Sequence, residues 1–202
     1  HDGSDMESQL INNLVTAQTG RVVVAAAGNE GHRNIHLQSP GSSDTSFTWV
    51  NTSMSNSSVP YIEVWGDTAQ LRKVTFAFGA DKTSPAYSLR GKKSFFDIKS
   101  CLGIFKHDSL MVNNKRLGYI DYMADPAGKS YVLHVQFTPD STAYNWRLFF
   151  TGNGKFDAWS NDYVYTSLPS AGTYPAMAKY TAADNNQNMA GGFHCLDNVI
   201  TV

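Results

Sequence analysis

The protein has 202 residues, of which 42% are hydrophobic and only 16% charged, and its formal net charge is −1. This length is enough for one large domain, or for one domain with a piece of another. The balanced charge excludes a protein that binds nucleic acid through a basic field, and no stretch is long and apolar enough to span a bilayer. We therefore expect neither nucleic acid nor a membrane as a partner.

The cysteines, the composition and the first residues bear on where the protein is located and on whether it is part of a longer chain. Cys101 and Cys195 are too far apart to form a metal-binding pair, and two free thiols and one disulfide are equally compatible with the sequence. Abundant Ser, Thr, Asn and Gly favour a β-rich, exported protein. The chain opens with "HDGSD", without Met and without a signal peptide, so we expect a piece of a longer protein.

The first predicted element is a helix over residues 4–20. Ser4 and Glu7 have the spacing of a capping box, and Gly20 supplies a stop. Between them, apolar residues recur at helical spacing: Met6, Leu10, Ile11, Leu14 and Val15. The continuous apolar run that follows, residues 21–27, predicts a strand covered on both faces, as in a parallel α/β sheet.

From residue 46 onward the pattern changes to short strands. Seven segments are alternating or rich in aromatics, with turn sequences and no helix between them: "SFTWV", "PYIEVWG", "KVTFAFG", "SFFDI", "LGYIDYM", "SYVLHVQF" and "YNWRLFFTG". This predicts an antiparallel β-sandwich of the jelly-roll type.

The alternation also predicts which side chains point inward. In "SYVLHVQF", Tyr131, Leu133, Val135 and Phe137 share one face, and His134 and Gln136 lie on the other. In "KVTFAFG", a single face carries Val74, Phe76 and Phe78.

Two separated segments resemble one family. "DGSDMESQLINNLVTAQTGRVVVAAAGNEG" is similar to the helix and central strand of the subtilisin-like serine proteases, and the closing "DNVITV" is similar to the strand that the family reaches soon afterwards. The resemblance implies a split α/β protease domain with an inserted β-sandwich, similar to bacterial subtilases that carry a jelly-roll insert. Residues 1–38 and 197–202 would belong to the protease domain, and residues 39–196 to the insert.

The resemblance assigns candidate site residues. Asn29 corresponds to the asparagine that lines the oxyanion hole, where a fixed amide donor stabilises the charge that develops during acyl transfer. Ala26, Ala27 and Gly28 correspond to part of the wall of the primary specificity pocket. The expected function is that of a serine endopeptidase, secreted or in the cell envelope, with a protein or peptide as substrate.

The catalytic triad is not in this chain. None of the family's Asp, His and Ser motifs occurs in the 202 residues, so we expect the chain alone to be inactive. The rest of the protease domain would pack on the two termini. No cofactor is expected; structural calcium is conceivable at the Asn- and Asp-rich turns, but no set of ligands can be mapped.

The inserted domain leaves two interpretations open. It is either a structural or regulatory part of the protease, or a non-catalytic module that binds carbohydrate, peptide or a protein partner. An exposed row of aromatic residues would favour a binding module, and buried ones a structural insert. The candidates are Trp49, Trp65, Trp146, Trp159 and Tyr163, of which Trp159 has the most polar surroundings.

Overall fold

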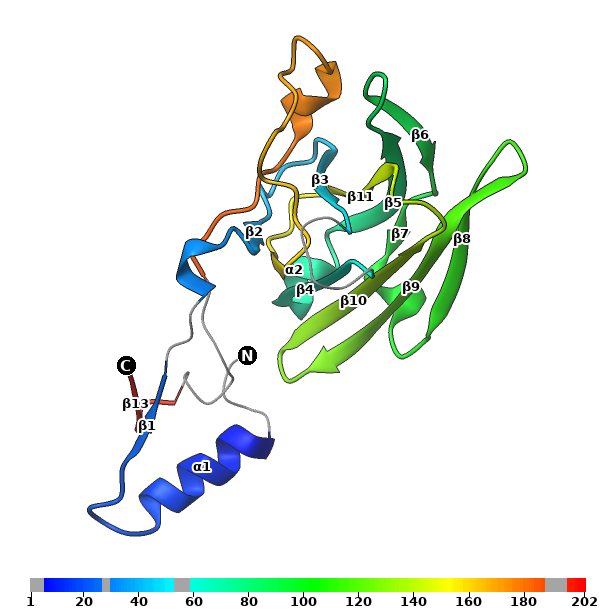
Figure 1. Cartoon of the computed structure of the whole chain (residues 1–202). Helices are drawn as coiled ribbons and strands as arrows, with labels where there is room; N and C mark the ends of the chain where they lie inside the picture. The colour runs from blue at the N-terminus through cyan, green and yellow to red at the C-terminus, as the bar shows by residue number, and fades with distance from the viewer. Residues whose placement is uncertain (1–5, 27–29, 53–58, 188–195) are drawn as a thin grey trace. The chain divides into compact units, whose positions relative to one another are not determined.

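The structure, a computed structural model, describes residues 6–26, 30–52, 59–187 and 196–202 (Figure 1). The chain is mainly β, with antiparallel sheets, as the sequence predicts. It divides into two compact units, His1–Arg33 with Asn185–Val202, and Asn34–Asp184. We call them the terminal unit and the β unit.

The helix of the terminal unit is shorter than predicted. Helix α1 spans Met6–Thr16, and its predicted capping residue Ser4 lies outside the described residues. The Thr16 hydroxyl donates to the carbonyl of Asn12 at 2.8 Å. The chain then turns, and Gly20 has a φ of +89°, a conformation that disfavours other residues. The helix therefore ends before the predicted stop, because the reversal takes up residues 17–20.

The predicted doubly buried strand is also shorter and less covered. Strand β1 spans Val23–Ala25 and pairs with β13, Val199–Thr201. Val22 and Val24 are 60% and 57% exposed. The prediction that both faces are covered is wrong for the described residues, because the face that carries Val22 and Val24 is exposed. A single-turn 3₁₀ helix, η1 (Glu30–His32), follows.

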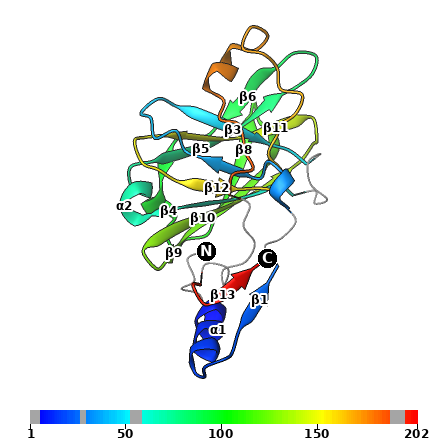
Figure 2. The same ribbon diagram turned by 90° about the vertical axis from the view of Figure 1, so that its left-hand side faces the viewer.

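The β unit consists of two antiparallel sheets (Figure 2). The first has six strands in the order β2 (His36–Gln38), β12 (Asp157–Trp159), β4 (Tyr61–Asp67), β10 (Ser130–Pro139), β9 (Lys115–Ala127) and β8 (Lys106–Val112). The second has five, in the order β3 (Ser46–Val50), β11 (Tyr144–Thr151), β5 (Thr75–Lys82) and β6 (Ser88–Lys92), with β7 (Phe96–Asp97) paired with β5.

The main hydrophobic core lies between these sheets. Side chains of both sheets form one cluster, in which Phe78 packs edge-on against Phe137 with ring centroids 5.7 Å apart. The predicted inward faces are confirmed, because this cluster contains Val74, Phe76, Phe78, Tyr131, Leu133, Val135 and Phe137. His134 and Gln136 point to the opposite face.

Short helices interrupt the strands, contrary to the prediction of none. Helix α2 (Thr68–Leu71) begins where Asp67 accepts a hydrogen bond from the backbone of Ala69 at 2.7 Å. The 3₁₀ helices η2 (Ile98–Cys101) and η3 (Pro175–Lys179) lie in connections. A single turn is too short to show helical periodicity, so the sequence pattern missed them.

The outer face of the five-stranded sheet is buried as well. A second cluster, formed by Phe47, Trp49, Ala77, Phe149 and Val164, packs against side chains of the segment 168–180. Within it, Asp81 and Arg147 form an ion pair and are 0% and 3% exposed. The Arg147 guanidinium lies 3.7 Å from the centroid of the Phe47 ring.

The two ends of the β unit are bonded to each other. The backbone amides of His36 and Asp184 donate to each other's carbonyl groups, at 3.1 and 2.6 Å. The His36 ring is buried, with Nδ1 2.8 Å from Asp184 Oδ1 and Nε2 3.0 Å from Asp157 Oδ1. We call this arrangement the end clamp. It places the entry and the exit of the β unit side by side.

Candidate functional site

The predicted oxyanion segment follows β1. Ala26 is exposed directly after the strand, and Ala27, Gly28 and Asn29 lie outside the described residues. The roles predicted for these four residues therefore remain predictions.

Strands β1 and β13 come from opposite ends of the sequence and pair in parallel. Val23, Val24 and Ala25 face Val199, Ile200 and Thr201. The amide of Val202 donates to the carbonyl of Ala25 at 2.9 Å, and the Asn198 side chain donates to Asn12 on α1 at 2.7 Å. Figure 2 shows the two strands side by side, next to α1. The terminal unit thus has the local structure of a parallel α/β layer.

The terminal unit also exposes large apolar side chains on both the helix and the strands. The exposed fractions are 87% for Met6, 57% for Leu10, 52% for Leu14, 57% for Val24 and 51% for Ile200. Apolar residues at these regular positions normally face a core, so this layer has the surface of an element that packs against further structure.

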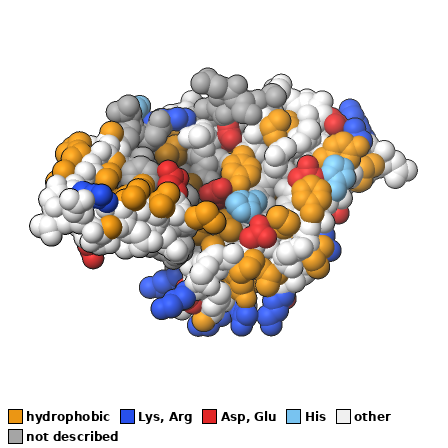
Figure 3. All heavy atoms as spheres, turned by 90° about the horizontal axis from the view of Figure 1, so that it is seen from below, with side chains coloured by type: hydrophobic (Ala, Val, Ile, Leu, Met, Phe, Trp, Pro, Cys, Tyr) orange, Lys and Arg blue, Asp and Glu red, His pale blue; other side chains and the backbone are white. Residues whose placement is uncertain are grey.

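In the β unit, functional groups gather on the outer face of the six-stranded sheet. Cross-strand pairs bring His134 opposite both Glu63 and Met123, and Gln136 opposite both Tyr61 and Asp121. Figure 3 shows histidine, acidic and hydrophobic side chains gathered on one surface, with lysine and arginine side chains mostly at its rim. This face is therefore polar and aromatic, unlike the apolar inner face.

Glu63 lies at the centre of a hydrogen-bond network on this face. Its Oε1 accepts from the Tyr61 hydroxyl at 3.0 Å and its Oε2 from the Trp65 indole at 3.2 Å. His134 Nδ1 lies 3.5 Å from Glu63 Oε1 and 2.5 Å from the Tyr61 hydroxyl. A protonated His134 has two acceptors within reach of Nδ1, the Tyr61 hydroxyl and Glu63, and Tyr61 itself donates to Glu63.

The charges of this network stabilise one another. The hydrogen bond to His134, with help from Trp65 and Tyr61, lowers the pKa of Glu63 to about 2. The same bond to Glu63 raises the pKa of His134. Burial, followed by the charge of Glu63, raises the pKa of Tyr61, so that its hydroxyl keeps its proton. The result is a carboxylate that stays ionised well below neutral pH.

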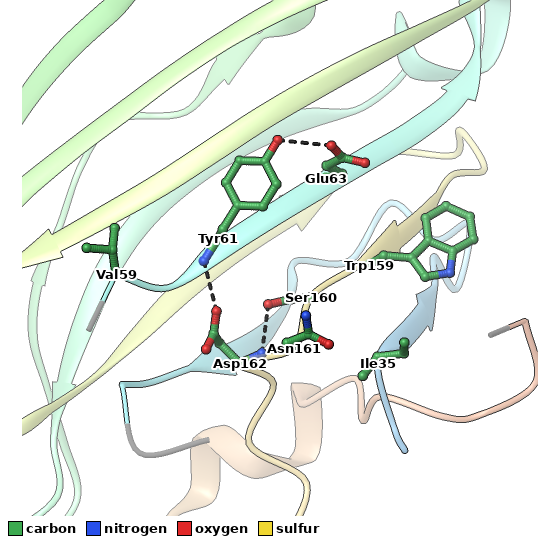
Figure 4. Close-up of a pocket in the computed structure, with 8 residues that line it drawn as sticks. All are labelled: Ile35, Val59, Tyr61, Glu63, Trp159, Ser160, Asn161 and Asp162. Carbon is green, nitrogen blue, oxygen red and sulfur yellow. Dashed lines mark hydrogen bonds between the residues drawn. The ribbon is translucent and has the colours of Figure 1, made fainter. Parts of the chain in front are cut away.

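A cavity of about 320 Å³ opens beside this network (Figure 4). Its walls come from three separate parts of the β unit, the start of β2, the start of β4 and the segment after β12. Figure 4 shows Tyr61 and Glu63 along one side, Trp159 and Ile35 along another, and Asn161 and Asp162 at the base. Its size is at the lower end of the range of about 300–1,000 Å³ that small-molecule sites occupy.

Two side chains that form the cavity are held in place by aromatic neighbours. The Trp159 ring packs against His36 with centroids 5.1 Å apart, and the Tyr61 ring stacks on His134 at 6.2 Å. The backbone amide of Tyr61 also donates to Asp162 Oδ2 at 3.0 Å. The walls are therefore preorganised by contacts within the β unit.

A second, smaller cavity of about 150 Å³ lies on the same face. It shares Tyr61 and His134 with the network but is lined mainly by apolar groups, among them Phe105 and Met123. Phe105 is 65% exposed.

The structure separates the aromatic candidates into two groups. Trp49, Trp146 and Tyr163 are fully or almost fully buried, at 0%, 1% and 0% exposure. Trp65 and Trp159 are half-buried on the outer face of the six-stranded sheet. The sequence singled out Trp159 by its polar surroundings as the candidate for exposure, and it is half-buried, as Trp65 is. The sequence analysis missed Tyr61, whose alternation in "PYIEVWG" places it beside Glu63 on the outward face.

In the part of the chain that the structure describes, neither the cysteine nor the possible metal ligands form a reactive or metal-binding site. Cys101 is a buried free thiol, and burial raises its pKa to about 11, which leaves it protonated at neutral pH; Cys195 lies outside the described residues. Within the described ranges, no group of three His, Cys, Asp or Glu side chains could hold a metal ion. None of the helices described is long and apolar enough to cross a membrane.

Comparison with models of known protein families and with curated protein sequences found no match for this chain.

Proposed function

We propose that this chain is part of a subtilisin-like serine endopeptidase in which the β unit is inserted between two neighbouring strands of the catalytic domain. The observation that carries the proposal is the parallel pairing of β1 with β13. These strands are separated by the whole β unit in sequence, yet they are adjacent in one sheet, preceded by a helix, as in the α/β domain that the two terminal sequences resemble.

The end clamp supports the insertion. Domains are tolerated as insertions when their two ends lie close together, because the host strands then need not move apart. His36 and Asp184 meet this condition through paired backbone hydrogen bonds. The strand connections support the jelly-roll type, since successive strands β2, β3, β4 and β5 alternate between the two sheets, as do β10, β11 and β12.

The exposed apolar side chains of the terminal unit also support the proposal, because the remainder of a catalytic domain would cover them. Leu10, Leu14, Val24 and Ile200 would each be covered by the remainder of the catalytic domain. Replacing Leu14 and Val24 by Ser should therefore destabilise the full-length protease, but leave the unfolding of the β unit unchanged.

In the assembled enzyme, Asn29 would donate its side-chain amide to the oxyanion of the tetrahedral intermediate. Ala26, Ala27 and Gly28 would line the pocket for the substrate side chain, and their small size leaves room for it. The Asp, His and Ser of the triad would be supplied by segments outside these 202 residues. Export to the cell envelope or the medium belongs to the same proposal.

The test uses the full-length protein encoded by the parent gene. We expect an Asp motif and a His motif before this chain, a Gly-Thr-Ser motif after it, and labelling of that serine by a fluorophosphonate probe. Removal of the oxyanion asparagine in subtilisin lowers kcat by about 100- to 1,000-fold, and Asn29→Ala should do the same here. Asn13→Ala, which removes an exposed asparagine from α1, is the matched control and should keep full activity.

Substituted triad positions, or an Asn29→Ala variant as active as the wild type, would contradict the proposal. The isolated 202-residue chain should hydrolyse no peptide, and labelling of any of its own serines by the probe would equally contradict the assignment of the triad.

A further inference from the structure

The cavity beside Glu63 combines aromatic walls with uncharged hydrogen-bonding groups. Trp159 and Tyr61 supply two ring surfaces, of which Tyr61 is 38% exposed. Ser160 and Asn161 add a hydroxyl and an amide at the base, and Asn161 is exposed. A ligand that fits must therefore have an apolar surface for the rings and several hydroxyl or amide groups around it.

The charge balance of the cavity favours an uncharged ligand. Two carboxylates line the cavity, Glu63 and Asp162; both Glu63 oxygens already accept hydrogen bonds, and His134 lies 3.5 Å from its Oε1. Asp162 is 3% exposed and its Oδ2 accepts from the Tyr61 backbone. Among the described residues that line the cavity, none is a lysine or an arginine. An anionic ligand would find no cation there, and a cationic one would meet carboxylates that are already engaged.

We propose that this cavity is a binding site for a neutral saccharide, which would make the β unit a carbohydrate-binding module. A pyranose ring presents a patch of C–H groups on each face and hydroxyl groups around its edge. The C–H patch would lie on the ring of Trp159 or Tyr61, and the hydroxyls would reach Asn161 and Ser160. A volume of about 320 Å³ admits a chain end or one or two sugar units, not a long buried polymer.

The walls need little adjustment on binding. His36 holds Trp159 from behind and is itself fixed by Asp157 and Asp184. His134 holds Tyr61 through the stacked rings. Side chains that are already ordered lose less conformational entropy on binding. Contacts with the weakly hydrated face of a sugar can therefore give a measurable affinity.

This inference does not depend on the peptidase proposal, because every residue involved lies in the β unit. The test uses the chain of 202 residues as it is, titrated by calorimetry with soluble hexasaccharides: cellohexaose, xylohexaose, mannohexaose, laminarihexaose, maltohexaose and chitohexaose. Concentrations up to about 5 mM reveal a site with a Kd near 1 mM. We expect at least one of these probes to bind.

Variants locate the site. Trp159→Ala should weaken binding by about tenfold or more, since it removes an aromatic contact surface. Asn161→Ala changes only an exposed side chain and should weaken binding by a few-fold without changing the thermal unfolding temperature. Phe105→Ala is the matched control, because Phe105 is an exposed aromatic that lines the second cavity and not this one.

Three outcomes would overturn the inference. The first is that none of the six saccharides binds. The second is equal affinity of Trp159→Ala, Asn161→Ala and the wild type. The third is binding of an oligolysine peptide in place of the saccharides, which would make this surface an acidic docking face. None of these outcomes would affect the peptidase proposal, whose tests concern Asn29 and the triad.

Discussion

Loss of the buried carboxylate of Asp81 should destabilise the β unit strongly. Asp81 accepts from the Trp49 indole at 2.6 Å, from Arg147 Nε and from the Tyr174 hydroxyl at 3.2 Å. Arg147 is 3% exposed, so water cannot replace the lost carboxylate. The variant Asp81→Ala leaves a buried cation without its counter-ion and a buried indole N–H without its acceptor.

The size of the loss in unfolding free energy depends on the contacts that Arg147 retains in the Asp81→Ala variant. Removing one partner of a buried ion pair costs about 3–5 kcal/mol. In Asp81→Ala, the guanidinium still donates to the Tyr174 hydroxyl at 2.6 Å and still lies over the ring of Phe47. We therefore expect a loss near the lower limit, about 3 kcal/mol, which is a large part of the roughly 5–15 kcal/mol that stabilises a typical domain.

Urea unfolding at neutral pH, followed by tryptophan fluorescence, measures this loss directly. The control is the double variant Asp81→Leu/Arg147→Met, which removes both charges and retains apolar volume. It should be more stable than Asp81→Ala, because no uncompensated charge remains. A loss below about 1 kcal/mol, the size typical of exposed pairs, or a double variant less stable than Asp81→Ala, would refute the reasoning.

Two further predictions concern other parts of the β unit. The stabilisation lost in Glu63→Gln should be largest between about pH 4.5 and 6.5. Below this window the unfolded chain binds a proton at Glu63, whose pKa in the folded unit is lowered to about 2, so the stabilisation falls progressively towards pH 2. Above it the unfolded chain releases the proton of His134, whose pKa in the folded unit is raised, so the stabilisation falls again as the pH rises through that raised pKa. Unfolding curves across pH 2–9 check this, and a pH-independent difference would contradict it. Gly118→Ala should cost about 1–3 kcal/mol, because its Cβ would lie 2.5 Å from the Thr138 carbonyl oxygen, whereas Gly172→Ala, with no atom closer than 3.6 Å, should unfold like the wild type.

The sequence predicted the strands whose faces differ in polarity. In β10, each inward residue alternates with an outward one, so both the core and the outward position of His134 were predictable. By contrast, β6 and β8 were missed, because "SLRGK" contains only one large apolar residue, Leu89, and "KHDSLMV" carries polar residues on both faces. Both are the last strands of their sheets, where one edge faces solvent and selection for apolar residues is weak.

The burial of β5 and β11 on both faces was not predictable either. Their alternation indicated one inward face, but the segment 168–180 covers the opposite one. That segment has no helical or strand periodicity, since it packs through scattered side chains such as Tyr174 and Tyr180. Only the fold shows that these residues form a layer.

The cavity was partly predictable. Trp159 stood out by its polar neighbours, but Ile35, Tyr61 and Asn161 are brought together by the pairing of β12 with both β2 and β4. Pairing between strands that are so distant in the sequence leaves no signal in a single sequence. The same reason explains why the partnership of Glu63 and His134 was not recognised.

The end clamp also bears on the order in which the chain folds. Without it, β1 and β13 would have to find each other across the whole intervening chain, and closing a loop costs entropy that grows with its length. Once the β unit has folded and bonded His36 to Asp184, only the short tethers on either side remain free. The parallel pair should therefore form after the β unit, as a late and fast step, and a variant that slows the folding of the β unit should slow the pairing of β1 with β13 to the same extent.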